Sequence, residues 1–483
     1  MPRHRTLRAL IDWSHDLLNE RERLVFRRLS IFANGFKLEA AVALLCEDLK
    51  EHEIFDGLAS LVDKSLIVTD SGPDSVRYRL LESTRAYAAE RLATAGDDEF
   101  AARLHRRYFR DLFAAKRARE DESVQSFRAE STSALLTELD NVRAALDSAV
   151  APAEIVVAGD LLAQLTVSWA FIGLGREGEM RLEEILPKLP QNEPKLHVGV
   201  LSTLSLTLVI TGRRLAYAFD LATLALAYAR TSGDDRTLAW ALAYFTSAAI
   251  SNRRFEVAEK ALAELAALPN KAVRLRLLFL GYRQLLAFMR GDFEGVVSAH
   301  ALAIEESQSF GALEAVRDDT YHVAASELAL GRSRRAIDLQ REGVKRYRAS
   351  GHPWLAHNLE SLAVFLAWAG DLDEAAKAAR EAIELLADKD LSDPAPDIDE
   401  HAFILALRGN YEGAALLEGS AEAALQRNAN ERNPFMALIH DRVMVLLRER
   451  LQAGELHDLA SRGAALTWAE TVSLLMDEYD SSC

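Results

Sequence analysis

A short turn signal, usually a glycine followed by a polar residue, recurs through the last two thirds of this chain at a nearly fixed interval. The intervals lie between 37 and 41 residues, and Arg253 fills the one position without a glycine. Each turn separates two apolar stretches of helical length. This period is typical of stacked helical hairpins, in which each hairpin buries its apolar face against its neighbours. The glycines are Gly175, Gly212, Gly291, Gly331, Gly370 and Gly409.

We therefore predict an all-α fold, a TPR-like α-solenoid with about seven hairpins after residue 150. The hairpins are longer than an ideal TPR unit by roughly one helical turn, so TPR-like is the better term. Solenoids of this kind usually bind other molecules, because their curvature creates one long surface lined by the first helix of each hairpin. The repeat thus favours a binding function over catalysis.

The charge of the chain is unevenly distributed. Its 483 residues carry a net charge of −16, whereas the first 120 residues hold 21 basic and 20 acidic side chains. The excess acid therefore lies in the repeats, which would repel the phosphates of a nucleic acid. The array suits a basic or apolar partner, or the charge only keeps the chain in solution.

The two cysteines, Cys46 and Cys483, indicate neither a disulfide framework nor a zinc site. A reducing, cytoplasmic setting is the default expectation for such a chain. The sequence holds no run of 18 apolar residues, so we expect no membrane span.

The first 96 residues predict a winged helix. Apolar residues at helical spacing are followed by two short β-rich segments, an order typical of a winged helix-turn-helix. Asn19 and Glu22 form a capping-box pattern at the start of the second helix. We expect helices near 7–18, 19–35, 38–46, 54–62 and 83–95, and strands near 65–69 and 76–80.

The fourth helix stands where a winged helix would read DNA. Residues 51–62 contain no Lys or Arg and three acids, Glu51, Glu53 and Asp56. Phosphate contacts and guanine recognition both favour basic side chains. The pattern therefore favours a winged helix that packs against protein, and disfavours specific DNA binding.

Three segments give the chain a family resemblance: RTLRALIDWSHDLLNERERLVFRRLSIFANGF, LASLVDKSLIVTD and RYRLLESTRAYAAERL. They resemble the winged-helix segment of bacterial STAND (NB-ARC-type) ATPases, many of which are predicted transcriptional regulators. The likeness covers residues 5–96 and continues in ELDNVRAAL and GAALTWAETVSLLMDE. It implies an upstream nucleotide-binding domain and a C-terminal TPR-like sensor array. It also implies that Leu81, Glu82 and Arg85 face the nucleotide-binding domain, where relatives often carry a nucleotide-sensing histidine.

The sequence contains no G-x-x-x-x-G-K-[ST], so we expect no cradle for a triphosphate and no cofactor. The resemblance then implies the downstream half of such a regulator. A truncated gene, a mis-assigned start and a natural stand-alone form are all compatible with this. We predict three parts: a winged-helix domain (1–96), a helical linker (97–150) and the repeat array (151–483).

The linker has the most basic stretch of the chain, which includes Arg103, Arg106 and Arg107. A solvated helix face is the favoured interpretation, and a phosphate- or partner-binding helix is the alternative. Histidines such as His401 and His357 stand alone in the sequence and are expected on surfaces. No catalytic motif, metal-ligand spacing or H-E-x-x-H is present, so we predict a protein that is not an enzyme.

The predicted binding surface is the concave face of the array. For its tryptophans, packing between helices is the favoured alternative. The candidate residues are Trp240, Tyr244, Arg283, Tyr321, His322, Asn358 and Trp368.

Three functions remain open. The chain is the non-catalytic sensor of a STAND-type regulator and binds a protein, peptide or small effector, with a separate nucleotide-binding or DNA-binding subunit as a further partner. Alternatively it is a stand-alone TPR-like scaffold, or a DNA-binding winged-helix regulator. The acidic fourth helix argues against the last of these.

Overall fold

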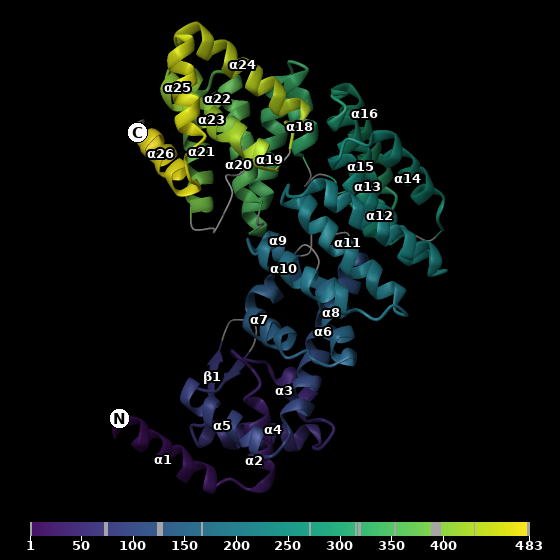
Figure 1. Ribbon diagram of the computed structural model, residues 1–483, viewed down its shortest axis with the longest axis vertical. Coiled ribbons are helices and arrows are strands. Elements are labelled where there is room, and N and C mark those ends of the chain that lie inside the picture. The colour runs from purple at the N-terminus through teal and green to yellow at the C-terminus, as the bar shows by residue number, and fades with distance from the viewer. Residues whose placement is uncertain are drawn as a thin grey trace. The chain divides into compact units, whose positions relative to one another are not determined.

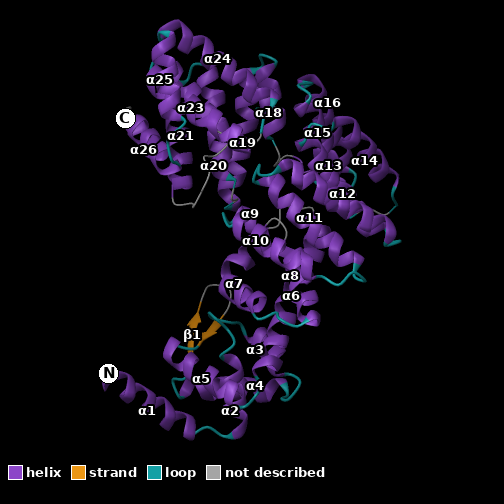
Figure 2. Ribbon diagram, in the orientation of Figure 1, coloured by secondary structure: helices purple, strands orange, loops and turns teal. Residues whose placement is uncertain are grey.

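The computed structural model is helical almost throughout, with one pair of short strands near its N-terminus (Figures 1 and 2). It describes residues 2–71, 76–122, 129–165, 168–269, 272–313, 316, 320–351, 354–387, 398–428 and 430–480. Cys483 therefore lies outside the described residues. No helix in these ranges is long and apolar enough to cross a membrane.

The chain forms two compact units. The first comprises residues 1–117, 133–165 and 184–196, and the second comprises 118–132, 166–183 and 197–483. Two helices, α6 (Asp98–Glu122) and α7 (Ala129–Asp147), contribute residues to both units. Whether the functional boundaries fall at residues 96 and 150 stays a prediction.

The first unit contains the winged helix that the sequence predicts. The wing is an antiparallel pair in which Val68 lies opposite Arg79. Asn19 caps the second helix as expected, because its side chain accepts from Glu22 N while Glu22 accepts from Asn19 N. The elements are α1 (Pro2–Asp16), α2 (Glu20–Leu29), α3 (Leu38–Leu45), α4 (Glu51–Asp63), β1 (Val68–Ser71), β2 (Val76–Arg79) and α5 (Glu82–Thr94), followed by α6, α7, α8 (Pro152–Leu165) and the 3-10 turn η1 (Leu186–Lys188).

Helix α7 is bonded directly to the winged helix. Asn141 is fully buried, and its side chain accepts from Ala33 N at 2.9 Å and donates to Gly35 O at 3.1 Å. Glu138, one turn earlier, pairs with Arg77 of the wing. These contacts explain the ELDN pattern of the sequence, because buried backbone groups next to the wing need partners.

The linker helix α6 exposes Arg103 and Arg107 as expected, but it buries Arg106. Arg106 is 1% exposed, and its guanidinium pairs with Glu154 and donates to Ser148 O at 2.8 Å. The expectation of an exposed basic face is therefore wrong at this residue. A buried guanidinium needs a carboxylate and hydrogen bonds, and Arg106 uses them to fasten α6 to the start of α8.

The second unit is the repeat array, and the predicted fold class is confirmed: an all-α, TPR-like solenoid follows the winged helix. Its helices are α9 (Ser168–Phe171), α10 (Gly175–Ile185), α11 (Pro194–Ile210), α12 (Leu215–Thr231), α13 (Asp235–Ser251), α14 (Phe255–Ala267), α15 (Val273–Met289), α16 (Phe293–Gln308), α18 (Tyr321–Ala329), α19 (Ser333–Ser350), α20 (Leu355–Trp368), α21 (Leu372–Ala387), α22 (Ile398–Leu407), α23 (Tyr411–Asn428), α24 (Pro434–Arg450), α25 (Ala453–Gly463) and α26 (Trp468–Asp480).

The turn glycines do what the sequence predicts at five of the six positions. Gly212, Gly291, Gly331, Gly370 and Gly409 all have positive φ angles, which a residue without Cβ adopts at little cost. The residue after each donates its N–H to a carbonyl five residues back, as in Arg213 N to Leu208 O at 2.9 Å.

Gly175 is the exception. The left-handed residue of that turn is Gly173, with φ of 79°, and α10 begins at Gly175. The predicted turn position is therefore wrong by two residues. The short helix α9 ends at Phe171, and the residue that takes a positive φ lies just after a helix end.

The array has two large hydrophobic cores. One runs from α11 to α15 and includes Leu242, Ala258 and Leu286. The other begins at Phe288, near the end of α15, and runs to Tyr479 in α26. We call these parts the first and second lobes of the array.

Candidate functional site

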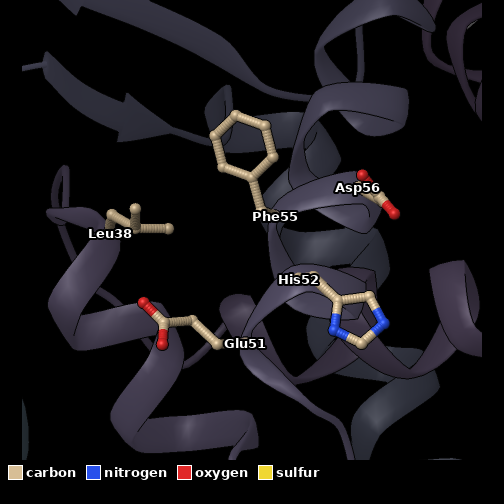
Figure 3. A pocket seen from close by; sticks show the side chains of 5 residues that line it. All are labelled: Leu38, Glu51, His52, Phe55 and Asp56. Atoms are coloured by element: carbon tan, nitrogen blue, oxygen red, sulfur yellow. The ribbon is translucent and has the colours of Figure 1, made fainter.

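The outer face of α4 borders an open hollow in the winged helix. The hollow measures about 500 Å³ and is lined by Leu38 of α3 and by four residues of α4 (Figure 3). The ring of Phe55 is 53% exposed there. The α4 residues are Glu51, His52, Phe55 and Asp56.

Glu53, the third acid of α4, binds other residues of the winged helix. Its carboxylate accepts from Lys50 N at 3.0 Å and pairs with Arg21 at 3.0 Å. The hydrogen bond from Lys50 N lowers the pKa of Glu53, with a further contribution from the charge of Arg21. Glu51 and Asp56 therefore supply the carboxylates of the hollow, next to an exposed aromatic ring.

The residues predicted to face a nucleotide-binding domain lie on one helical turn. Leu81 is the N-cap of α5 and is 44% exposed, Glu82 is exposed, and Arg85 is half-buried. Their placement on the surface leaves them accessible to another domain. Whether one binds them stays a prediction.

The predicted groove residues divide by burial. Trp240 and Tyr244 of α13 are buried with ring centroids 5.6 Å apart. Asn358 of α20 is also buried, and its side-chain oxygen accepts from Gln340 Nε2 at 3.0 Å. Residues 239–250 are buried without interruption, so this stretch of α13 packs on all sides.

The other four groove residues are partly accessible. Tyr321 and His322 lie at the start of α18, and both rings contact Phe288. Arg283 of α15 has a side chain 37% exposed and pairs with Glu306 at 3.5 Å. Trp368 packs its ring against the guanidinium of Arg442, 3.6 Å from the ring centroid. These four residues are therefore the part of the predicted binding surface that a partner could contact and that substitutions can test.

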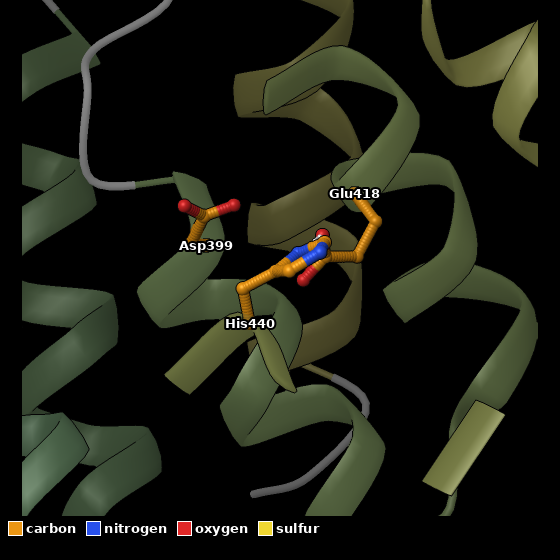
Figure 4. A group of neighbouring side chains, drawn as sticks. All are labelled: Asp399, Glu418 and His440. Carbon is orange, nitrogen blue, oxygen red and sulfur yellow. Dashed lines mark hydrogen bonds and ion pairs between the residues drawn. The ribbon is translucent and has the colours of Figure 1, made fainter. Parts of the chain in front are cut away.

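A buried ionic cluster lies between α22, α23 and α24 in the second lobe. The guanidinium of Arg432 donates from Nε to Asp399 at 2.8 Å and from Nη2 to its other oxygen at 3.0 Å. Arg432 also donates to Glu422 at 2.9 Å. His440 Nδ1 lies 2.7 Å from a carboxylate oxygen of Glu418 (Figure 4).

The three residues Asp399, Glu418 and His440 offer ligand atoms within 4.8 Å of one another. Arg432 already supplies the positive charge at this point, since its guanidinium binds Asp399 through both oxygens. A metal ion bound here would compete with the guanidinium for the oxygens of Asp399. The two positive charges would also lie close together and repel each other. The arrangement fits a structural ion network better than a metal centre.

A second buried network centres on Glu360 of α20. His357 Nδ1 lies 3.1 Å and His401 Nε2 lies 3.3 Å from its two oxygens. Burial would raise the pKa of Glu360, but the hydrogen bonds from both histidines lower it to about 2. His401 Nδ1 in turn lies 2.7 Å from the hydroxyl of Tyr479 in α26.

The expectation that His401 lies on the surface is therefore wrong, since it is 2% exposed. One signal in the sequence could have indicated this: Asp399, Glu400 and His401 lie in the first turn of a helix that is otherwise apolar. Three consecutive polar residues cannot all share one outer face of a helix, so some had to point inward.

Comparisons with known proteins agree with the two-part structure. Residues 18–93 match the family model of the winged helix-turn-helix domain. Two proteins, one from Mycobacterium bovis and one from Mycobacterium tuberculosis, are each named a putative HTH-type transcriptional regulator. Each is 40% identical over 185 residues, which cover 38% of this chain. The chain spans about a fifth of their length, since the match covers 20% of each.

Among solved structures, the chain is similar to a STAND protein with a tetratricopeptide repeat sensor from Pyrococcus horikoshii. The TM-score is 0.43 at 14% identity, and the match covers 93% of this chain and 66% of that one. The winged helix-turn-helix match and the fold together describe a winged helix-turn-helix domain followed by TPR-like helical repeats, with homologues named putative HTH-type transcriptional regulators.

Proposed function

We propose that the chain is the non-catalytic sensor and interaction part of a STAND-type transcriptional regulator, and that it works through protein contacts. Its TPR-like repeats bind a protein segment, a peptide or a small effector. Its winged helix packs against another domain or subunit. The regulator acts in the cytoplasm, and this chain requires no cofactor of its own.

The surface of α4 carries the proposal. A helix that reads the major groove needs donors for phosphates and for guanine, and Arg or Lys provides them. Here the exposed face offers Glu51, Asp56 and the ring of Phe55 around a hollow. The exposed aromatic ring favours a protein contact, where aromatic anchors are enriched, and the two carboxylates disfavour contact with DNA phosphates.

The array supports the second half of the proposal. Beyond residue 120 the chain has 36 basic and 53 acidic side chains. The helices of the array form hairpins that pack against one another through apolar cores. Such a surface disfavours nucleic acid and suits a basic or apolar segment. Of the four partly accessible groove residues, we assign Arg283, Tyr321 and His322 to this contact, and we leave out Trp368 because the guanidinium of Arg442 packs on its ring.

A binding experiment tests the array. The purified chain is used to capture partners from cells of its source, alongside a variant with Arg283→Ala, Tyr321→Ala and His322→Ala. Tyr244 and Asn358 stay unchanged because they are buried and their loss would disturb packing. The control carries Leu224→Ala, Arg230→Ala and Leu302→Ala, three exposed positions on second helices.

The proposal expects a partner that the chain and the control retain and the groove variant loses by tenfold or more. All three proteins must give the same circular dichroism. If the groove variant keeps every partner, the array surface assigned here is wrong, and the winged helix becomes the candidate contact.

A nucleotide titration tests the non-catalytic part. Calorimetry with ATP and ADP is expected to give no binding in the micromolar range, and no phosphate release, because the sequence lacks a phosphate-binding loop. Micromolar binding to this chain would contradict the proposal.

DNA binding is the second candidate, because the relatives are named as HTH-type regulators. The wing also exposes Arg79, a side chain of the kind that contacts DNA phosphates. The two candidates differ in whether α4 contacts base edges.

A further inference from the structure

One turn of the array departs from the glycine rule. Arg253 occupies the position that glycine fills in the turns at 212, 291, 331, 370 and 409, and its φ is also positive, at 55°. The turn closes in the same way, with Arg254 N donating to Ala249 O at 2.8 Å. A side chain is unfavourable in this conformation, so its presence points to a use for the side chain.

The side chain of Arg253 bonds to a segment almost 180 residues away. Its Nη2 donates to Arg432 O at 2.7 Å, and its Nε lies 2.9 Å from Glu431. Asn430 Nδ2 donates to Gly212 O at 2.6 Å, at the preceding turn. We call residues 430–434 the clasp.

The clasp also contacts the next turn. A Cβ atom on Gly291 would lie 3.6 Å from Cβ of Pro434, so the proline ring rests against this glycine. Three successive turns, at 212, 253 and 291, thus contact four residues of the clasp, Asn430, Glu431, Arg432 and Pro434. The contacts at 212 and 253 join the two lobes, since Phe435 directly after the clasp is buried in the core of the second lobe.

The two ends of the clasp are held differently. On the second lobe, the side chain of Arg432 is only 13% exposed and forms a bidentate pair with Asp399. Asn433 caps α24 by accepting from Phe435 N and Met436 N at 3.0 and 2.9 Å. These bonds are shielded from water and fix the clasp to its own lobe.

The contacts of Arg253 are exposed by comparison, whereas the hydrogen bond from Asn430 to Gly212 O is partly buried. Arg253 and Glu431 have side chains 37% and 73% exposed. Ion pairs of this kind are weak and are screened by salt. The clasp is therefore firmly anchored at one end and weakly attached at the other.

We propose that the clasp is a releasable lock between the two lobes of the array. In the closed form, Arg253 and Gly212 hold residues 430–432. Loss of these contacts lets the lobes separate about α15 and α16, where the two cores adjoin. The lock is a conformational device of the array itself and does not depend on the identity of a bound partner.

Distance measurement by pulsed electron spin resonance tests the lock. Both cysteines are replaced by serine, and spin labels are placed at Glu256→Cys on α14 and Asp441→Cys on α24, both exposed. The key variant is Arg253→Gly, which removes the side chain and gives the turn its preferred residue. Because glycine relaxes the backbone, this variant is expected to fold with an unchanged or higher thermal midpoint.

We expect one narrow distance distribution for the labelled chain at low salt. In Arg253→Gly the closed peak should lose more than half of its population to longer distances, and 1 M NaCl should shift the unmodified chain in the same direction. Arg230→Ala, which removes an exposed pair with Glu264 inside the first lobe, is the matched control and should keep the closed peak.

An Arg253→Gly distribution that superimposes on that of the parent chain overturns the proposal. If this variant fails to fold, Asn430→Ala combined with Glu431→Ala removes the hydrogen bond to Gly212 O and the ion pair with Arg253, and the same criterion applies. Restoration of the closed peak by Arg253→Glu combined with Glu431→Arg would show that the ion pair itself holds the lock.

Discussion

Asn141 shows how one buried amide fastens a helix to a neighbouring motif. Its side chain hydrogen-bonds to the backbone of the segment that follows α2. It accepts from the N–H groups of Ala33 and Asn34 and donates to the carbonyl of Gly35. Buried backbone groups that lose their partner are costly, more than the bond itself is favourable. The sequence could show that an asparagine lies on an apolar helix, but not which backbone groups it meets.

Asn141→Ala should lower the free energy of unfolding of the first unit by about 1–2 kcal/mol, because the part-buried N–H of Ala33 and the carbonyl of Gly35 each lose a hydrogen bond, while Arg77 still donates to that carbonyl. Urea unfolding followed by circular dichroism measures it. Thr137→Ala, exposed on the same helix, is the control and should change the free energy by less than about 0.5 kcal/mol. Equal effects of the two substitutions would mean that the amide is not a fastening point.

The pair of His440 and Glu418 predicts a pH dependence. The hydrogen bond with Glu418 raises the pKa of His440, and burial raises the pKa of Glu418. Both shifts mean that the folded state binds more protons than the unfolded chain. The free energy of unfolding therefore falls as pH rises. The part due to His440 is fully present below its unfolded pKa, near 6.5, and is lost as pH rises through the higher folded value.

His440→Asn, which keeps a neutral donor near Glu418, should lower the free energy of unfolding more at pH 6 than at pH 8, as measured by urea unfolding. Comparison with the unsubstituted protein isolates this contribution from those of His15 and His105, whose pKa values are lowered by burial and which act in the opposite direction. A pH difference that is unchanged in this variant would assign the dependence to other groups.

At the scale of elements, two glycines let the backbones of α23 and α25 contact each other directly. A Cβ atom on Gly419 would overlap the carbonyl oxygen of Ala460, and one on Gly463 would overlap that of Leu416. The sequence shows these glycines only as weak points in helices, since their role depends on a partner helix about 40 residues away. Close helix approach thus explains two residues that helix propensity disfavours.

Gly419→Ala should destabilise the second lobe by about 1–3 kcal/mol, because the helices must move apart to admit a methyl group. Gly454→Ala is the control: nothing lies within 4 Å of its Cβ position, and alanine favours helix there. Thermal unfolding should separate the two variants by several degrees. A neutral Gly419→Ala would contradict the close packing of α23 and α25.

At the scale of the whole molecule, local periodic features were predictable and long-range polar contacts were not. Turn glycines, helical period and the β-hairpin follow from neighbouring residues, so they indicated the hairpins and the winged helix. The inward placement of His401 and Arg106, and the bond between Arg253 and residue 432, depend on residues far apart in the sequence. Only the folded chain brings these residues together.

The selection of DNA sequences by the intact chain tests the central claim, that this winged helix acts through protein contacts. The chain is incubated with a library of random duplexes at 150 mM salt, and bound DNA is amplified and sequenced through several rounds. The account predicts no enriched motif, because Glu51, Phe55 and Asp56 form the outer face of α4. An enriched motif, bound at 150 mM salt and lost when Glu51 and Phe55 are changed together to Ala, would contradict it.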